Sequence, residues 1–216
     1  MRIERRAALL GQPGRSRARA GASTNLTIVL IAALIGWLTV SPAAAKESTG
    51  LSLASDPIAW ALDGYSGIVM VEPAGLPGWR ISAEFFSLTF PEAVVNLSES
   101  NREGAWSREV TGSGVIYLDH HPSADGAGWH YGGAVNLMFS RVTRDGISGE
   151  GRLTSLELLS RGGYRWFPIQ GMGFFVNPWL GLGALFVVDE PEKVGGERFE
   201  EMPVQLLGTL HIGWRL

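Results

Sequence analysis

The sequence contains no cysteine. Disulfide bonds, thiolate zinc sites, thiol nucleophiles and a lipid anchor on an N-terminal cysteine are therefore excluded. Residues 46–216 also contain no apolar run of about 18 residues, so this region predicts no membrane-spanning helix. A G-x-S-x-G nucleophile elbow is absent as well. The fold must therefore be stabilised without disulfide cross-links.

The first 45 residues have the three parts of a secretory signal peptide. Residues 1–25 hold six arginines against one glutamate, residues 26–40 form an uncharged apolar run, and Ser41-Pro42-Ala43-Ala44-Ala45 places small residues at the −3 and −1 positions. We predict cleavage after Ala45 and one mature domain, residues 46–216. An uncleaved membrane anchor is the alternative, but the run of 15 residues is shorter than the ~20 that a spanning helix needs.

The predicted mature region is acidic and rich in glycine. Removing six arginines and one glutamate from 18 basic and 21 acidic residues leaves 12 and 20, a formal net charge of −8. Because phosphate binding needs a basic surface, this balance argues against nucleic acid as a partner. The 25 glycines of the region suit tight turns and crowded strands better than helices.

Apolar residues recur at every second position in several segments, which is typical of strands that are exposed on one face. The last segment, 206–216, is the clearest, with leucine, isoleucine and tryptophan on one face and polar or small residues on the other. Residues 129–140, 156–166 and 174–188 repeat the pattern, and 79–90 and 110–120 follow it less regularly. Within 79–90, Phe85-Phe86 indicates a β-bulge where the two faces exchange.

The connectors between these segments alternate in length. Short turns fall at 73–78, 121–128 and 168–172, and longer charged connectors fall at 91–109, 143–151 and 189–202. This alternation predicts an all-β fold, an antiparallel up-and-down transmembrane β-barrel with its short turns on the periplasmic side. Six strands are clear. An even total of about eight requires two more from residues 51–72, and the candidates are Ile58–Leu62 and Gly67–Glu72.

Tryptophans gather beside the short turns. Trp79, Trp129 and Trp166 adjoin these turns, and Trp214 lies near the C-terminus on the same side. Indole rings prefer the boundary between hydrocarbon and headgroups, so a ring of tryptophans at one level predicts membrane-interface aromatics. A soluble periplasmic β-barrel is the alternative, and it would use these residues as core.

If the apolar faces point toward lipid, the alternate residues point into the barrel. An eight-stranded interior is just wide enough for side chains to fill, and buried charges need partners. We therefore predict a packed polar network that closes the lumen, with a ligand or ion path through it as the alternative. The network residues are Arg80, Glu84, His130, Asn136, Glu157, Arg161, Arg165, Asn177, His211 and Arg215.

The histidines near residue 120 do not predict a metal site. Neighbouring residues of a strand point to opposite faces, so His120 and His121 cannot share an ion while both stay in the strand. We predict solvated residues at a strand end, and neither a metal nor a cofactor.

A lipid-modifying enzyme is a further alternative, since small barrels of the outer membrane include such enzymes. Such an enzyme requires a lumen histidine within hydrogen-bond reach of a serine. The sequence alone does not identify which residues would form a catalytic triad. The serines that could be paired with His130 or His211 are Ser82, Ser140 and Ser155.

In architecture and in its C-terminal strand, the mature region resembles the small outer-membrane barrels of Gram-negative bacteria, the OmpA/OmpX/OmpW-like class. That family usually ends in phenylalanine, whereas this chain ends in Leu216. The resemblance implies an outer-membrane location, contact with lipid and lipopolysaccharide, and the export and barrel-assembly machinery as partners. We expect a non-enzymatic structural, adhesive or protective role, with a narrow pore or carrier for small solutes as the alternative. The acidic connector 189–202 is expected to be a solvated external loop, or else a site for divalent cations or a basic partner.

Overall fold

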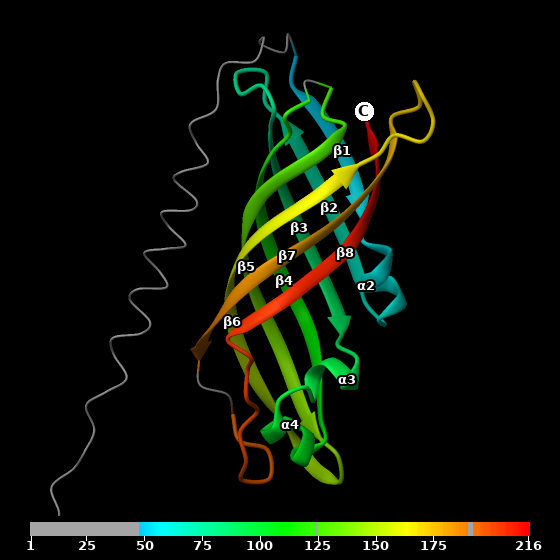
Figure 1. Ribbon diagram of the computed structural model, residues 1–216. Helices are drawn as coiled ribbons and strands as arrows, with labels where there is room; N and C mark the ends of the chain where they lie inside the picture. Colours follow the sequence, from blue (N-terminus) through cyan, green and yellow to red (C-terminus); the bar gives the residue numbers. More distant parts are fainter. Residues whose placement is uncertain (1–47, 124, 190–191) are drawn as a thin grey trace, which may run out of the picture. The chain divides into compact units, whose positions relative to one another are not determined.

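The computed structural model describes residues 48–123, 125–189 and 192–216 (Figure 1). The predicted signal peptide lies outside the described residues, so its cleavage after Ala45 stays a prediction. No described helix is long and apolar enough to cross a membrane. In chain order the elements are β1 (Gly50–Ser55), α2 (Pro57–Ala61), β2 (Tyr65–Glu72), β3 (Trp79–Thr89), α3 (Glu92–Val95), α4 (Glu99–Gly104), β4 (Trp106–His120), β5 (Gly128–Arg144), β6 (Ile147–Arg165), β7 (Phe174–Asp189) and β8 (Val204–Arg215).

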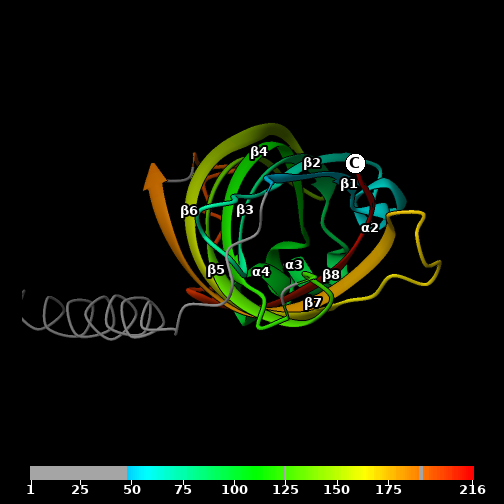
Figure 2. The same cartoon turned by 90° about the horizontal axis from the view of Figure 1, so that it is seen from above.

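The eight strands form one closed antiparallel barrel, seen end-on in Figure 2. Each strand pairs with its neighbours in the chain, and β8 closes the ring on β1 through pairs that run from Ser52↔Arg215 to Ser55↔Ile212. The predicted all-β, up-and-down barrel of eight strands is confirmed.

The two ends of the barrel differ in their connectors. The turn end carries the short connectors after β2, β4 and β6 together with the C-terminus, and the loop end carries the longer connectors after β3 and β7 (Figure 1). The strands are unequal in length, with 19 residues in β6 and six in β1. As a result β4, β5 and β6 reach well past the short β1–β2 hairpin toward the loop end (Figure 1).

The prediction for residues 51–72 was wrong in one strand. Residues Ile58–Leu62 are not a strand, because Pro57–Ala61 form the helix α2, and the first strand is Gly50–Ser55. The carboxylate of Asp56 accepts the backbone N–H of Ile58 at 2.8 Å, and Pro57 occupies the first helical position. An Asp-Pro pair of this kind is a helix start, which outweighs the weak alternation that follows it.

Two predicted connectors are also shorter than expected. The charged segment 143–151 is mostly strand, because β5 continues to Arg144 and β6 begins at Ile147, with Asp145-Gly146 as the turn. Gly146 has φ 72°, which glycine adopts without strain. The connector 91–109 ends earlier, at Ala105, and holds the short helices α3 and α4. Charged residues resemble a loop in the sequence even where the strands simply extend beyond the apolar part of the barrel.

The predicted bulge near Phe85-Phe86 is present. The register between β3 and β4 shifts between Phe86 and Leu88. From Ile81 to Phe85 the outward positions of β3 are exposed, whereas beyond Phe85 both Phe86 and Leu88 are partly buried. The shift therefore lies at the point where the alternation of the sequence becomes irregular.

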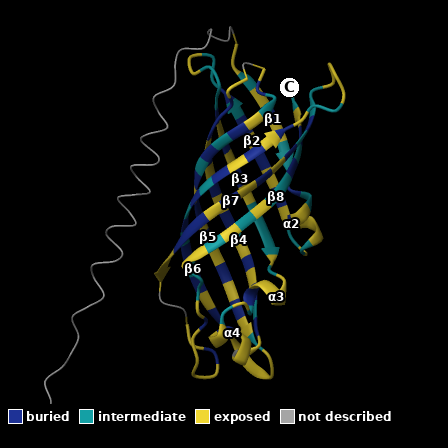
Figure 3. Cartoon of the chain, in the orientation of Figure 1, coloured by how far each residue is buried: buried dark blue, intermediate teal, exposed yellow. Residues whose placement is uncertain are grey.

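Buried and exposed residues alternate along the strands (Figure 3). Many of the exposed ones are large and apolar, and many of the buried ones are polar or charged. On β5, Val135 and Phe139 are 49% and 50% exposed, while Asn136 between them is buried. Apolar residues inside the barrel form three small clusters, and a few others, such as Val110 and Met138, are buried outside them. Soluble barrels have the opposite arrangement, in which the interior is the apolar core.

Candidate functional site in the barrel interior

All ten side chains predicted for the lumen lie on the inner face of the barrel. Nine are buried, and Arg215 is partly buried at the turn end. The structure groups them, with residues that the sequence did not indicate, into clusters that follow one another along the barrel axis.

The Asp119 cluster consists of Arg80, Asp119, His130, Arg161 and Asn177. Arg161 donates from Nε and Nη2 to the two oxygens of Asp119, at 2.9 and 2.6 Å. Arg80 Nη2 donates to the same carboxylate at 3.1 Å, and His130 Nδ1 lies 3.9 Å from it. His130 Nε2 shares a hydrogen bond of 2.7 Å with Asn177 Oδ1. Two buried guanidinium groups therefore depend on one buried carboxylate.

The Glu72 cluster lies at the turn end and consists of Ser52, Glu72, Arg165 and Arg215. Arg165 donates to Glu72 Oε1 at 2.7 Å and to Ser52 Oγ at 3.0 Å, and Arg215 donates to Glu72 Oε1 at 3.2 Å. The Arg165 guanidinium lies 3.8 Å from the ring centroid of Phe175, close enough for a cation–π contact. This contact partly replaces the water that a buried guanidinium loses.

The Glu84 cluster joins β2, β3, β4 and β8 at the middle of the barrel. Glu84 accepts from Ser66 Oγ at 2.8 Å and from Tyr117 Oη at 2.5 Å. Asp56 accepts from Thr209 Oγ1 at 2.6 Å. Both carboxylates are buried, and they accept hydrogen bonds from hydroxyl groups and a backbone N–H group rather than from cations.

Asp56, Glu84 and His211 have side chains of the types that bind metal ions in proteins. One ligand atom each of Asp56, Glu84 and His211 lies within 4.8 Å of the others. The sequence could not indicate this grouping, because the residues come from three distant segments. His211 Nε2 already accepts the indole N–H of Trp179 at 3.0 Å, and hydroxyl groups bond both carboxylates. Protein donors thus satisfy these atoms, so the geometry does not demand an ion.

A further cluster at the loop end was missed by the sequence analysis. Arg108 Nη1 donates to Glu201 Oε2 at 2.9 Å, and Ser155 Oγ donates to Glu201 Oε1 at 3.1 Å. Glu201 had been assigned to a solvated loop, but its side chain is only 5% exposed. Burial raises the pKa of Glu201, and the charge of Arg108 opposes that rise. Between this cluster and the Glu84 cluster, Asn136 donates to Glu157 at 3.1 Å.

The predicted interface aromatics fall into two groups. Trp129, Trp166 and Trp214 are 72%, 55% and 47% exposed on the outer face at the turn end. Trp79 is partly buried, because its ring packs against His120 at 5.0 Å between centroids. Three of the four tryptophans are therefore exposed on the outer surface of the barrel, where they can contact its surroundings.

The prediction that His120 and His121 are solvated was wrong, because both are buried. His120 lies between the rings of Trp79 and Tyr131, and His121 stacks on His130 with 4.9 Å between ring centroids. Burial lowers the pKa of His121, and the nearby charge of Arg80 adds to this effect. The backbone N–H of His121 donates to the carbonyl of Gly78 at 2.6 Å, which joins two turns over the end of the barrel.

No hydrogen bond between a serine and a histidine occurs among the described residues, whose lumen histidines bond Asn177 and Trp179 instead. The serines considered in the sequence have other surroundings. Ser140 bonds Arg108, Ser155 bonds Glu201, and Ser82 is buried without a hydrogen-bond partner in the described protein.

No protein-family model matches this chain, and neither does any curated protein. Among solved structures, a major outer membrane protein from Thermus thermophilus is 13% identical, over 79% of this chain and 100% of that chain, with a TM-score of 0.40. Neisserial surface protein A is 12% identical, over 78% of this chain and 94% of that chain, with a TM-score of 0.33. Likeness at this level carries no functional argument, so the interpretation of the chain rests on its own strand pairing and side chains.

Proposed function

We propose that this chain is an outer-membrane β-barrel with a structural, adhesive or protective role, and that a polar network closes its lumen. One observation carries the proposal: the barrel is apolar outside and charged inside. A surface of exposed leucine, isoleucine, valine and phenylalanine is unfavourable in water and favourable against lipid tails. A closed barrel also satisfies every strand edge, as a hydrocarbon environment requires.

The dimensions of the apolar surface support the same proposal. A transmembrane strand needs about 9–11 residues. On β5 the exposed face is apolar from Trp129 to Phe139 and becomes charged at Arg141, which pairs with Glu150 at 3.1 Å. The apolar stretch thus has the length of one membrane crossing. By the same argument the tryptophans of the turn end lie at the periplasmic boundary and the loop end lies outside the cell.

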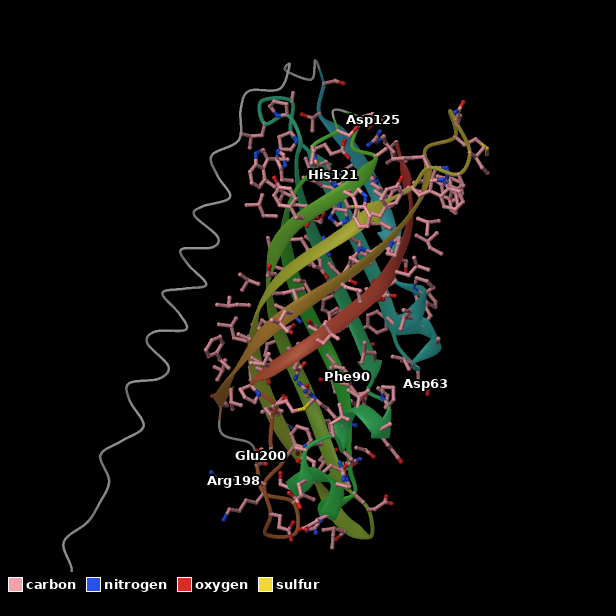
Figure 4. The ribbon with its side chains drawn as sticks, in the orientation of Figure 1. Asp63, Phe90, His121, Asp125, Arg198 and Glu200 are labelled. Carbon is pink, nitrogen blue, oxygen red and sulfur yellow. The ribbon has the colours of Figure 1, made fainter. Side chains whose placement is uncertain are left out.

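The loop end is covered by its own connectors. The Asn101 side chain donates to the carbonyl of Glu200 at 2.8 Å and accepts the Glu200 N–H at 3.0 Å, so the β3–β4 and β7–β8 connectors are joined. Figure 4 shows Glu200 next to Arg198 in the β7–β8 connector. The two connectors contribute to an apolar cluster of Val95, Trp106, Val142, Leu153, Val194 and Phe199, against which Phe90 packs. The external surface that contacts lipopolysaccharide or another cell is therefore a fixed pair of loops.

Planar-bilayer recording tests the closed lumen. Within each cluster the side chains bond one another across the interior, so we expect the inserted wild-type protein to give no regular single-channel steps. Insertion itself is verified by protection of the strands from added protease. Reproducible unitary currents from a protein shown to be inserted would instead support the narrow-pore alternative.

A further inference from the structure

A groove lies on the outer face of the barrel over β3, β4 and β5 and has a volume of about 630 Å³. Sites that bind small molecules have volumes of about 300–1,000 Å³ and are likewise lined mostly by apolar side chains. Exposed apolar side chains of the three strands form the walls of this groove, and glycines of β4 contribute to its floor. The walls are Phe85, Ile116, Leu137 and Phe139, and the glycines are Gly112 and Gly114.

The groove exists because β4 has glycine where its two neighbours have large side chains. Phe85, Gly114 and Leu137 lie directly opposite one another across β3, β4 and β5. A Cβ at Gly114 would have no atom within 4 Å, so internal packing does not require glycine there. At Gly181, in contrast, a Cβ would come within 2.7 Å of the backbone of Ser160. A glycine inside a strand often marks a place where a ligand approaches the backbone closely.

A β-bulge lies at the loop end of the groove. The register between β4 and β5 shifts between Val110 and Gly112, and Thr111 is the extra residue. Thr111 Oγ1 donates to the backbone carbonyl of Phe139 at 3.1 Å. A bulge bends its strand and is frequent beside functional sites. The bend and the two glycines therefore belong to the same short segment of β4.

The groove covers one half of the apolar surface. At one end Ile116 pairs with Val135, at the centre of the apolar stretch of β5. At the other end lies Thr111, and the next outward position of β4 is Glu109, which pairs with Arg141 at 3.7 Å. The five residue steps from Ile116 to Thr111 are about 17 Å long, close to one leaflet's half of a hydrocarbon core of about 30 Å. The charged pair offers both signs, so it selects no particular headgroup charge.

We propose that the groove binds one acyl chain of an outer-leaflet lipid, extended along β4 from the charged pair to the bilayer midplane. Phe85 and Leu137 lie two strand spacings apart, about 10 Å, which leaves the width of a single hydrocarbon chain between their side chains. The chain contacts the apolar walls without any change in the barrel. The inference rests on the proposed function, because it requires a barrel that is inserted in the membrane.

Filling the groove tests the proposal. Protein is extracted in detergent from outer membranes of cells that express the full chain, and native mass spectrometry counts the molecules of added dimyristoylphosphatidylcholine that it retains. We expect the wild-type protein to retain one lipid. Gly114→Leu should weaken this binding about tenfold, as expected when a side chain displaces about two methylene groups.

The matched control is Gly67→Leu. Gly67 pairs with Phe85 from the other side, is exposed and has no atom within 4 Å of a Cβ, but it does not line the groove. This variant should retain the lipid as the wild-type protein does. Electrophoresis without boiling verifies that both variants are folded, and Gly114→Ala should give a smaller loss if the leucine variant does not fold.

A crystal structure of the wild-type barrel grown in a monoolein mesophase is independent of the variants, and it should show a hydrocarbon chain along Gly112–Ile116. Equal lipid retention by the Gly114 and Gly67 variants overturns the lipid site, and so does a groove that is empty or filled by a second barrel. If the protein is still recovered with the outer membrane, such a result leaves the proposed function intact. Recovery in the soluble periplasm would overturn the proposed function itself.

Discussion

Replacing Asp119 by asparagine should destabilise the barrel by about 3–5 kcal/mol, because it leaves two buried guanidinium groups without a counter-charge. Arg80 and Arg161 both donate to this carboxylate, and all three side chains are almost fully buried. Asparagine has nearly the same shape, so the loss is one of charge and not of volume. The measurement is the free energy of unfolding in urea of protein refolded into lipid vesicles.

The matched control is Glu109→Gln. Glu109 also pairs with an arginine, Arg141, but both side chains are about half exposed on the outside of the barrel. A surface pair of this kind contributes about 0–1 kcal/mol. If Asp119→Asn were no more destabilising than Glu109→Gln, the interior network would not be an obligatory part of the fold.

Replacing Val135 by arginine should destabilise the membrane-inserted barrel by about 2–4 kcal/mol, the cost of a cation on the lipid face near the bilayer midplane. Val135 is 49% exposed at the centre of the apolar stretch of β5 and pairs with Ile116 of β4, which is 56% exposed. The expected result is a lower urea midpoint in vesicles and a smaller folded fraction on electrophoresis without boiling.

Thr143→Arg is the control, because Thr143 lies on the same strand and the same face but beyond the charged position Arg141. It should change stability by no more than about 0.5 kcal/mol, as is usual for exposed sites. A soluble barrel would tolerate both substitutions equally. Equal effects of the two variants would therefore contradict insertion into lipid.

The period-two pattern of the sequence was sufficient to predict the barrel, because an apolar outer face and a polar interior impose a strict alternation. The strands around Asn136, Asn177 and His211 were assigned to the correct face for this reason. The same pattern failed at residues 57–61, where the capping side chain of Asp56 favours a helical turn. Local hydrogen bonding prevailed there because only one turn of chain was involved.

The partners inside the lumen could not be predicted from the sequence. Asp119 was missed because the inward positions before it on β4, Val115 and Tyr117, are apolar or aromatic and obscure the alternation. Arg108 was missed because its strand begins four residues before the predicted start, at Trp106. Which of these side chains bond one another depends on the register between the strands. Arg80 and Arg161, which both bond Asp119, lie 39 and 42 residues away from it in the sequence.

Location in the cell tests the central claim most directly. Membranes of cells that express the full chain are separated by density, and the extracted protein is run on electrophoresis with and without boiling. The account predicts recovery with the outer membrane and a band whose mobility changes on boiling, as expected of a barrel that stays folded in detergent. Recovery in the soluble periplasm without detergent would contradict it, and the exposed leucines and tryptophans would then have to be a protein interface.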